Sequence, residues 1–124
     1  MKASYTTKEK LKSKKQIEQL FAEGSSISSF PLRLVYMSTT NEDNFPVKTG
    51  VSVSKKHFKK AVDRNRIKRL LREAYRLHKN AFFNNITTHY ALMILYIGND
   101  MPSFSQVEKA MLLLLKKFSD KNPQ

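Results

Sequence analysis

The sequence predicts an α+β fold, an α/β sandwich in which three helices pack against a small mixed sheet of four strands. Its 124 residues are enough for one hydrophobic core, so we expect a single domain over residues 1–124, with flexible ends at 1–10 and 120–124. Segments with the two-residue period of strands stand between segments with helical periodicity. One unbroken apolar run, residues 90–97, has the length of a strand buried on both faces. The expected order of elements is α-β-β-β-α-β-α.

Residues 13–24 are expected to form the first helix. Ser13 is a favourable N-cap, Gln16 stands at the capping-box position, and Gly24 is a typical C-terminal stop. The apolar residues that share one face of this helix are Ile17, Leu20 and Phe21.

Two or three strands are expected between this helix and the central one. The predicted four-stranded sheet requires three of its strands in this stretch. In residues 30–37 the side chains alternate, with Leu32, Leu34 and Tyr36 on one face and Arg33, Val35 and Met37 on the other. In residues 47–54 one face carries Val47, Val51 and Val53. Because residues 38–46 form a polar turn cluster, these two strands are expected to make an antiparallel pair.

Residues 55–79 contain the longest helical pattern of the chain. The apolar residues expected to face the core are Ile67, Leu70, Leu71, Ala74 and Leu77. Asp63 would interrupt this stripe, so we place it at or near the N-cap, where its carboxylate accepts backbone N–H bonds. His78 falls at the border of the stripe, a position typical of a partly buried structural histidine. Residues 80–89 indicate a loop of mixed character.

The last helix is predicted within residues 103–118. Ser105 is the expected N-cap, with Glu108 three residues later to complete a capping box. The residues expected to point inward are Val107, Ala110, Met111, Leu114 and Phe118.

Positive charge is concentrated in residues 55–79. The whole chain has 23 Lys and Arg against 10 Asp and Glu, a net charge of +13. Eleven of the positive residues lie in this segment, accompanied only by the acids Asp63 and Glu73. The cations occupy the helix face that the apolar stripe leaves open. Such a field favours nucleic acid as a partner, ahead of an acidic membrane surface or an acidic protein.

The composition of this face favours a polyanion over plain solvent. A solvated helix intersperses Glu with Lys at i,i+4, whereas like charges at that spacing repel each other. Arginine predominates after residue 63, and its planar guanidinium binds phosphate oxygens in two places at once. The flanking strand patterns do not offer the paired helices of a DNA reader. Polar and aromatic neighbours such as Asn65, His57 and Phe58 suit RNA, so RNA is favoured over DNA.

No catalytic or metal-binding pattern competes with this interpretation. The chain has no cysteine, which excludes disulfides and thiolate metal sites. His57, His78 and His89 do not form a metal-binding motif. Ser52 and Lys55 have the Ser-x-x-Lys spacing of some acyl enzymes, but Ser52 falls in a strand pattern, where that chemistry is not found. We therefore expect no catalytic residue and no metal ligand in the protein.

No segment is typical of export or membrane insertion. The N-terminus lacks the apolar run of a signal peptide, and residues 90–97 are too short to span a bilayer. We expect a soluble, cytoplasmic protein with no membrane partner. A surface amphipathic role for the leucine run 112–115 is left open.

The segment GVSVSKKHFKKAVDRNRIKRLLREAYR, residues 50–76, resembles the protein subunit of bacterial ribonuclease P. The family carries a similar strand and then an Ala-Val-x-Arg-Asn-Arg-x-Lys-Arg helix, often named the RNR motif. The matching positions in the helix are Ala61, Val62, Arg64, Asn65, Arg66, Lys68, Arg69, Arg72 and Glu73. The resemblance extends more loosely to the basic N-terminus, to FAEG at residues 21–24, and to the final strand and helix.

The resemblance implies one RNA-binding domain with a left-handed crossover between parallel strands, against the usual preference for right-handed ones. It implies a monomer in a 1:1 complex with ribonuclease P RNA. In this complex the protein is implied to bind the 5′ leader of precursor tRNA and to assist its removal. Hydrolysis and its Mg²⁺ ions are expected to belong to the RNA. The residues implied to contact the RNA subunit are Lys60, Arg64, Asn65, Arg66, Lys68, Arg69, Arg72 and Arg76. The residues implied to line a leader cleft between the sheet and the first helix are Phe21, Val53, Lys55 and Lys56.

Two positions depart from the family pattern. Ile17 stands where members often have an aromatic residue, and Val35 is near a position where some have Tyr. A base stacked on an aromatic ring contributes about 1–3 kcal/mol, so these departures weaken or move the leader contacts. Tyr36 would replace them only in another strand register, because adjacent strand residues face opposite sides. From residue chemistry alone, a plain RNA-binding module, such as a small ribosomal or assembly protein, remains the alternative.

Overall fold

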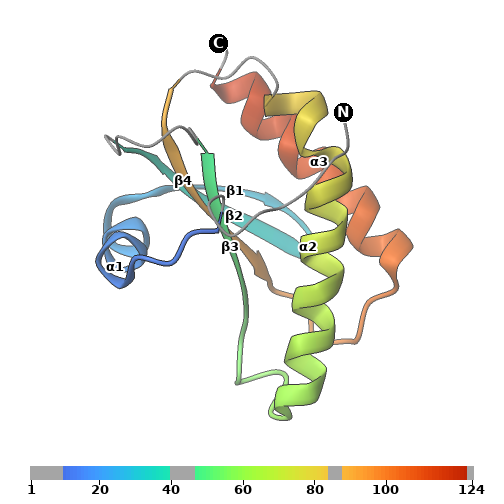
Figure 1. The fold of residues 1–124 in the computed structure, drawn as a ribbon. Coiled ribbons are helices and arrows are strands. Elements are labelled where there is room, and N and C mark those ends of the chain that lie inside the picture. Colours follow the sequence, from blue (N-terminus) through green and yellow to red (C-terminus); the bar gives the residue numbers. More distant parts are fainter. Residues whose placement is uncertain (1–9, 40–46, 84–87, 123–124) are drawn as a thin grey trace.

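A four-stranded sheet carries helices on both of its faces (Figure 1). The computed structural model describes residues 10–39, 47–83 and 88–122. The elements are α1 (Lys14–Glu23), β1 (Ser25–Ser29), β2 (Leu32–Ser38), β3 (Val47–Val53), α2 (Ala61–Phe83), β4 (Tyr90–Tyr96) and α3 (Phe104–Lys121). The predicted fold class and order of elements are confirmed. Of the residues expected to be flexible, 1–10 and 120–124, residues 1–9 and 123–124 lie outside the described residues, as does most of the expected turn at 38–46. Lys10, however, forms a bridge with Thr49, and residues 120–121 belong to α3.

The strands are ordered β1-β2-β4-β3. β2 is antiparallel to both β1 and β4, whereas β3 is parallel to β4. The expected antiparallel pairing of β2 with β3 is therefore wrong, because β4 lies between them. The physical reason is the apolar run of β4, which is buried on both faces of the sheet and so occupies a central place. The left-handed sense of the β3–α2–β4 connection stays a prediction.

The two faces of the sheet are covered unequally. α2 and α3 lie on one face and α1 lies on the other (Figure 1). The predicted alternation of β2 is confirmed, because Leu34 and Tyr36 belong to the main core under α2 and α3, and Val35 lies on the α1 side. The smaller core on the α1 side consists of Leu11, Leu20, Val35, Ala91 and Met93.

The predicted boundaries of α1 are confirmed, whereas the start of α3 and the end of α2 differ from the predictions. α1 is capped as expected, with the Ser13 side chain accepting from the Gln16 N–H and the Gly24 N–H donating to the Leu20 carbonyl. α3 begins two residues earlier than expected, because Ser103 is the N-cap and Gln106 completes its capping box. α2 continues to Phe83 and includes part of the expected loop. Its added residues are held by packing, since Phe82 and Phe83 lie against the main core.

α2 is rotated slightly from its predicted orientation. Ile67, Leu71 and Ala74 are buried as expected, but Leu77 is exposed and Tyr75 is buried in the core. The Thr49 hydroxyl on β3 donates to the Tyr75 hydroxyl at 2.8 Å inside the protein. This buried bond fixes the rotation of α2 relative to the sheet, and so decides which of its side chains face outward.

The segment before α1 covers part of the outer edge of β3. Lys10 forms an isolated parallel bridge with Thr49, and the Leu11 N–H donates to the Thr49 carbonyl at 3.0 Å. Leu11 then enters the smaller core between α1 and the sheet. This segment is therefore tied to the domain by both backbone and side-chain contacts.

Candidate nucleic-acid interface

The outward surface of α2 carries cations that have no counter-charge among the residues that the structure describes. We call it the basic face; it consists of Asn65, Arg66, Lys68, Arg69 and Arg72. Within residues 10–39, 47–83 and 88–122, none of these side chains makes an ion pair or a side-chain hydrogen bond. Arg66, Arg69 and Arg72 are exposed. The predicted cationic face is thus present and presents several guanidinium groups to solvent.

Arg64 is directed inward, although it belongs to the same motif. Its Nη1 donates to the carbonyl of Phe58 and to that of Lys59, both at 2.8 Å. Phe58 is itself buried, with its ring 5.9 Å from the ring of Tyr96. Arg64 therefore holds the end of the β3–α2 connection against the start of α2.

Arg76 is paired on the helix surface with Glu73. Its Nη2 donates to Glu73 Oε1 at 2.6 Å, and its Nε donates to Oε2 at 3.1 Å. These hydrogen bonds lower the pKa of Glu73 and raise the pKa of Arg76 from their ordinary values. Arg76 thus offers less free charge to a ligand than the basic face does.

The connection between β3 and α2 adds a second group of cations. We call residues 54–60 the basic loop, because it exposes Lys55, Lys56, Lys59 and Lys60. The Phe58 N–H donates to the Ser54 carbonyl at 3.2 Å, and the Lys56 N–H donates to the Ser54 hydroxyl at 3.1 Å. Together with Arg64 these bonds order the loop next to the first turn of α2. Asp63 lies in that turn, near the N-cap as expected, where its negative charge interacts favourably with the helix dipole. The expected backbone N–H bonds to its carboxylate are not found among the described residues.

The residues implied for a leader cleft are not all on one side of the sheet. Phe21 lies on α1 and is 51% exposed, so it does not share the buried face with Leu20. Val53 is 7% exposed in the main core, on the face opposite to α1. The structure therefore does not bring Val53 together with Phe21. Lys55 and Lys56 follow β3 at its end and are exposed.

Three side chains from neighbouring strands form a row on the α1 side of the sheet. Arg33, Leu95 and Ser52 are direct partners across β2, β4 and β3. Arg33 is exposed, while Leu95 and Ser52 are half-buried. We call this row, together with Phe21, the α1-side surface. The alternation of side chains in β2 and β3 predicts the strand face on which Arg33 and Ser52 lie. Only the pairing of the strands shows that both residues flank Leu95.

Tyr36 does not replace the missing aromatic residue on this side. Its ring lies in the main core, 5.0 Å from the ring of Phe118 in an edge-to-face arrangement. Val35 faces α1 and is buried. Phe21 is therefore the aromatic side chain that the described part of α1 offers on the α1 side.

The histidines and acids of the described residues do not gather into a metal site. No group of three or more His, Asp or Glu side chains lies close enough to hold an ion in that part of the chain. His78 is half-buried as predicted, and its Nε2 lies 2.8 Å from Glu108 on α3. This contact links α2 to α3. No helix in the same residues is both long and apolar enough to cross a bilayer.

Comparison with known proteins decides the family. The family model named Ribonuclease P matches residues 5–119. The chain belongs to the ribonuclease P protein family. A ribonuclease P protein component from Porphyromonas gingivalis is 37% identical over 106 residues, which cover 83% of this chain and 77% of the relative. One from Chlorobium phaeobacteroides is 34% identical over 118 residues, covering 85% and 81%.

Solved ribonuclease P proteins share the fold. The protein from Staphylococcus aureus superposes with a TM-score of 0.70 at 22% identity, covering 89% of this chain and 94% of that one. The protein from Thermotoga maritima gives 0.68 at 23% identity, covering 88% and 96%. Family membership confirms the resemblance carried by residues 50–76, and with it the assignment to ribonuclease P and to tRNA processing.

Proposed function

We propose that the chain is the protein subunit of an endoribonuclease that removes the 5′ leader from precursor tRNA. In this proposal the basic face and Lys60 of the basic loop bind the RNA subunit. The α1-side surface binds the single-stranded leader. The complex contains one copy of each subunit and acts in the cytoplasm. The proposal rests on membership in the ribonuclease P protein family together with the charge arrangement on α2.

The observation that carries the proposal is the set of exposed arginines that have no counter-charge in the described part of the chain. Arg66, Arg69 and Arg72 are spaced three residues apart on one surface of a 23-residue helix. Their mutual repulsion is unfavourable in the isolated protein, and phosphate groups would relieve it. The helix is rigidly held, because Tyr75 is bonded to β3 and Arg64 fixes its first turn. A polyanion would therefore meet these groups already positioned.

Leader binding is supported by chemistry on the opposite face. Phe21 offers an exposed aromatic ring for an unpaired base, and Arg33 offers a guanidinium for a phosphate. Lys55 and Lys56 extend this charge past the end of β3. The two RNA surfaces are separated by the sheet and meet at the basic loop. One protein would thus hold the catalytic RNA on one side and the substrate on the other.

We assign the chemical step to the RNA subunit. Mg²⁺ bound by that RNA would activate the attacking water and stabilise the leaving oxygen. The role of this chain is to bind and orient, through the cations described above. No general acid, base or nucleophile is assigned to its side chains.

Reconstitution tests the proposal. Adding the protein to its cognate ribonuclease P RNA at low Mg²⁺ should restore cleavage of precursor tRNA at the 5′ end of the mature sequence. If the protein binds many RNAs equally and restores no cleavage, it is a plain RNA-binding module instead.

A double variant, Arg66→Ala with Arg69→Ala, links that activity to the basic face. It should weaken assembly and reduce the dependence of log K on log[salt] by about 1–2, because each lost phosphate contact changes the slope by roughly 0.7–0.9. The matched control is Lys116→Ala, which removes an exposed cation of α3 paired with Asp120 at 3.5 Å. A large drop in melting temperature for the double variant would show that these arginines are structural.

A further inference from the structure

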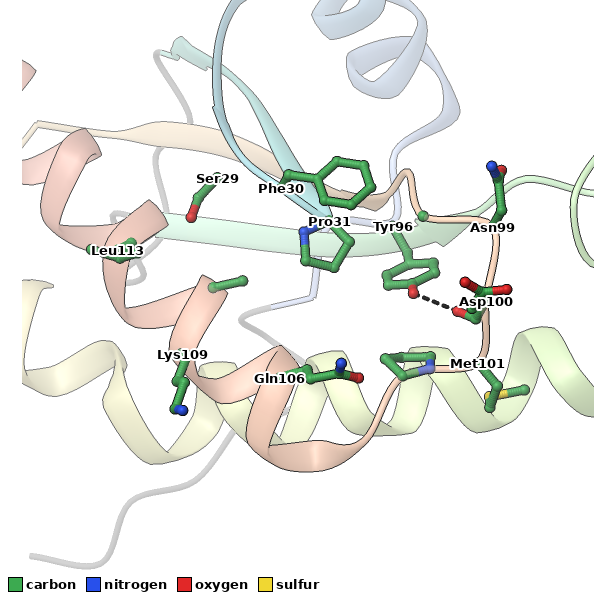
Figure 2. A pocket seen from close by; sticks show the side chains of 13 residues that line it. Ser29, Phe30, Pro31, Tyr96, Asn99, Asp100, Met101, Gln106, Lys109 and Leu113 are labelled. Atoms are coloured by element: carbon green, nitrogen blue, oxygen red, sulfur yellow. Dashed lines mark hydrogen bonds between the residues drawn. The ribbon is translucent and has the colours of Figure 1, made fainter.

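A pocket lies where the β1–β2 turn, the β4–α3 connection and the first turns of α3 meet (Figure 2). Its volume is about 530 Å³, within the range of small-ligand sites. The residues that matter for its chemistry are Phe30, Tyr96, Met101, Gln106, Lys109 and Leu113. It lies on the α2 and α3 side of the sheet, since Tyr96 belongs to the main core.

Exposed apolar side chains gather around this pocket. The described residues expose seven large apolar side chains, and three of them, Phe30, Met101 and Leu113, line it. Phe30 is 76% exposed, so its ring has little contact with the protein's own core. Figure 2 shows this ring beside Pro31, above the ring of Tyr96. The cluster therefore exposes the aromatic ring of Phe30 to solvent above the buried ring of Tyr96.

The floor of the pocket is preformed. The Tyr96 hydroxyl donates to the Asp100 carbonyl at 2.5 Å and so holds the β4–α3 connection. Burial, followed by the charge of Asp100, raises the pKa of Tyr96 from an ordinary value that already lies far above neutral pH, so the hydroxyl stays a donor. A Cβ at Gly98 would lie 2.6 Å from the Tyr96 oxygen, so only glycine allows the connection to pass this closely.

Polar groups at the rim are oriented for a ligand. The Gln106 Oε1 accepts from the Ser103 N–H at 2.9 Å, which fixes the carboxamide and leaves its N–H₂ as a directed donor. Lys109 supplies a cation one turn further along α3, and Asp100 is the acid on the lining. These two charges stand at opposite ends of the pocket (Figure 2). A phosphate would therefore enter at the Lys109 end.

The pocket also lies close to the basic loop, because a lining residue packs against a residue of that loop. The ring of Tyr96 lines the pocket and packs against Phe58 at 5.9 Å. Phe58 lies in the basic loop, where Arg64 holds its carbonyl. One aromatic pair thus separates the pocket from the cations assigned to the RNA subunit.

We propose that this pocket receives one unpaired base of the RNA subunit. The base stacks on Phe30, the Gln106 amide donates to an acceptor on the base edge, and Lys109 contacts the adjoining phosphate. This inference rests on the proposed function. It adds to the basic face a contact that recognises a base and not only the backbone. The RNA subunit is favoured over the leader because the pocket and the basic face lie on the same side of the sheet, opposite Phe21.

Chemical probing of base edges in the assembled complex tests the inference. With the wild-type protein, one unpaired base of the RNA subunit should become protected on assembly, before any precursor tRNA is added. Phe30→Ala should lose that protection and weaken assembly by about 5- to 100-fold, in line with the loss of one stacked base. Phe30→Trp should keep both. The matched control is Leu112→Ala, an exposed leucine next to Leu113 that does not line the pocket.

Three outcomes would overturn the inference. The first is an identical set of protected bases for the wild-type protein and Phe30→Ala. The second is a Phe30-dependent protection that appears only when precursor tRNA is present, which would make the substrate the occupant. The third is weakened assembly of Phe30→Ala although the wild-type protein protects no base, as expected if Phe30 contacts only the backbone of the RNA. Failure of the proposed function would look different, because the wild-type protein would then restore no cleavage at all.

Discussion

Arg64 and Arg66 are separated by one residue, yet only Arg66 offers its guanidinium to a ligand. Arg64→Ala removes two charge-assisted hydrogen bonds to the basic loop, at Phe58 and Lys59. We expect the variant to lose about 1–3 kcal/mol of stability, visible as a lower midpoint in urea unfolding. Arg66→Ala is the matched control and should unfold like the wild-type protein.

The salt dependence of RNA binding distinguishes the two arginines further. Arg66→Ala should lower the slope by roughly 0.7–0.9, whereas Arg64→Ala should lower the affinity with little change of slope. If Arg64→Ala is as stable as the wild-type protein and loses a full phosphate contact, Arg64 binds RNA directly and its role in the loop is secondary.

Glu73 limits the charge that Arg76 can offer. In Glu73→Gln a negative charge is removed from the surface beside the basic face, so the salt slope of RNA binding should steepen by up to about 1. Tighter binding at low salt should accompany the steeper slope. An unchanged slope would place Arg76 outside the RNA contact.

The same pair has a defined pH dependence. Its hydrogen bonds to Arg76 lower the pKa of Glu73, so the pair is fully present above the ordinary carboxyl range and is lost as the pH falls through the lowered pKa. In Arg76→Ala the pKa of Glu73, followed by NMR, should rise back toward its ordinary value.

At the scale of the elements, α3 illustrates how a cap is chosen. Ser103 and Ser105 both precede the apolar stripe, and each has a suitable residue three positions later. Only Ser103 has extended backbone and accepts from the Gln106 N–H. Ser103→Ala should therefore cost about 1 kcal/mol in thermal or urea unfolding, whereas Ser105→Ala, inside the first turn, should be close to neutral. If Ser105→Ala were the more destabilising of the two variants, Ser105 would be the N-cap of α3, as the sequence predicted.

Local periodicity was enough to predict most elements and their buried faces. The inward residues of α3, the alternation of β2 and the double-sided burial of β4 all follow from side-chain spacing. The pairing of the strands did not follow, because local pattern cannot say that β4 inserts between β2 and β3. The sequence of β1, four serines around Ile27, has no apolar alternation to mark it.

The candidate nucleic-acid interface was likewise predictable only in part. The charge count and the motif located the basic face, since both are properties of one helix. Which cations are free was not predictable, because Arg64 is bound by a loop whose path depends on the burial of Phe58. The placement of Val53 failed for a related reason. It follows from which face of β3 meets α1, and that is fixed by tertiary packing. The pocket at Phe30 joins the β1–β2 turn to residues 96–113, which are distant from it in sequence, and had no local signal.

For the whole molecule, the proposed function assigns two binding events to opposite faces of the sheet. Phe21→Ala should weaken binding of precursor tRNA by the assembled complex by about 5- to 100-fold, because one stacked base is lost. Binding of mature tRNA, which has no leader, should not change, nor should assembly with the RNA subunit. Measuring the two tRNAs side by side in a binding titration gives the comparison. An equal loss for both would show that Phe21 does not contact the leader.

The contact between Lys10 and Thr49 has a consequence for association between copies of the chain. An uncovered strand at the margin of a sheet can pair with the same strand of a neighbouring molecule and start aggregation. On β3 such pairing would have to displace the Leu11 N–H from the Thr49 carbonyl and pull Leu11 out of the smaller core. The other marginal strand, β1, is only five residues long and rich in serine, which makes it a poor template. Both marginal strands of the sheet are thus poorly suited to pairing with another copy of the chain, which favours the single protein copy of the proposed complex.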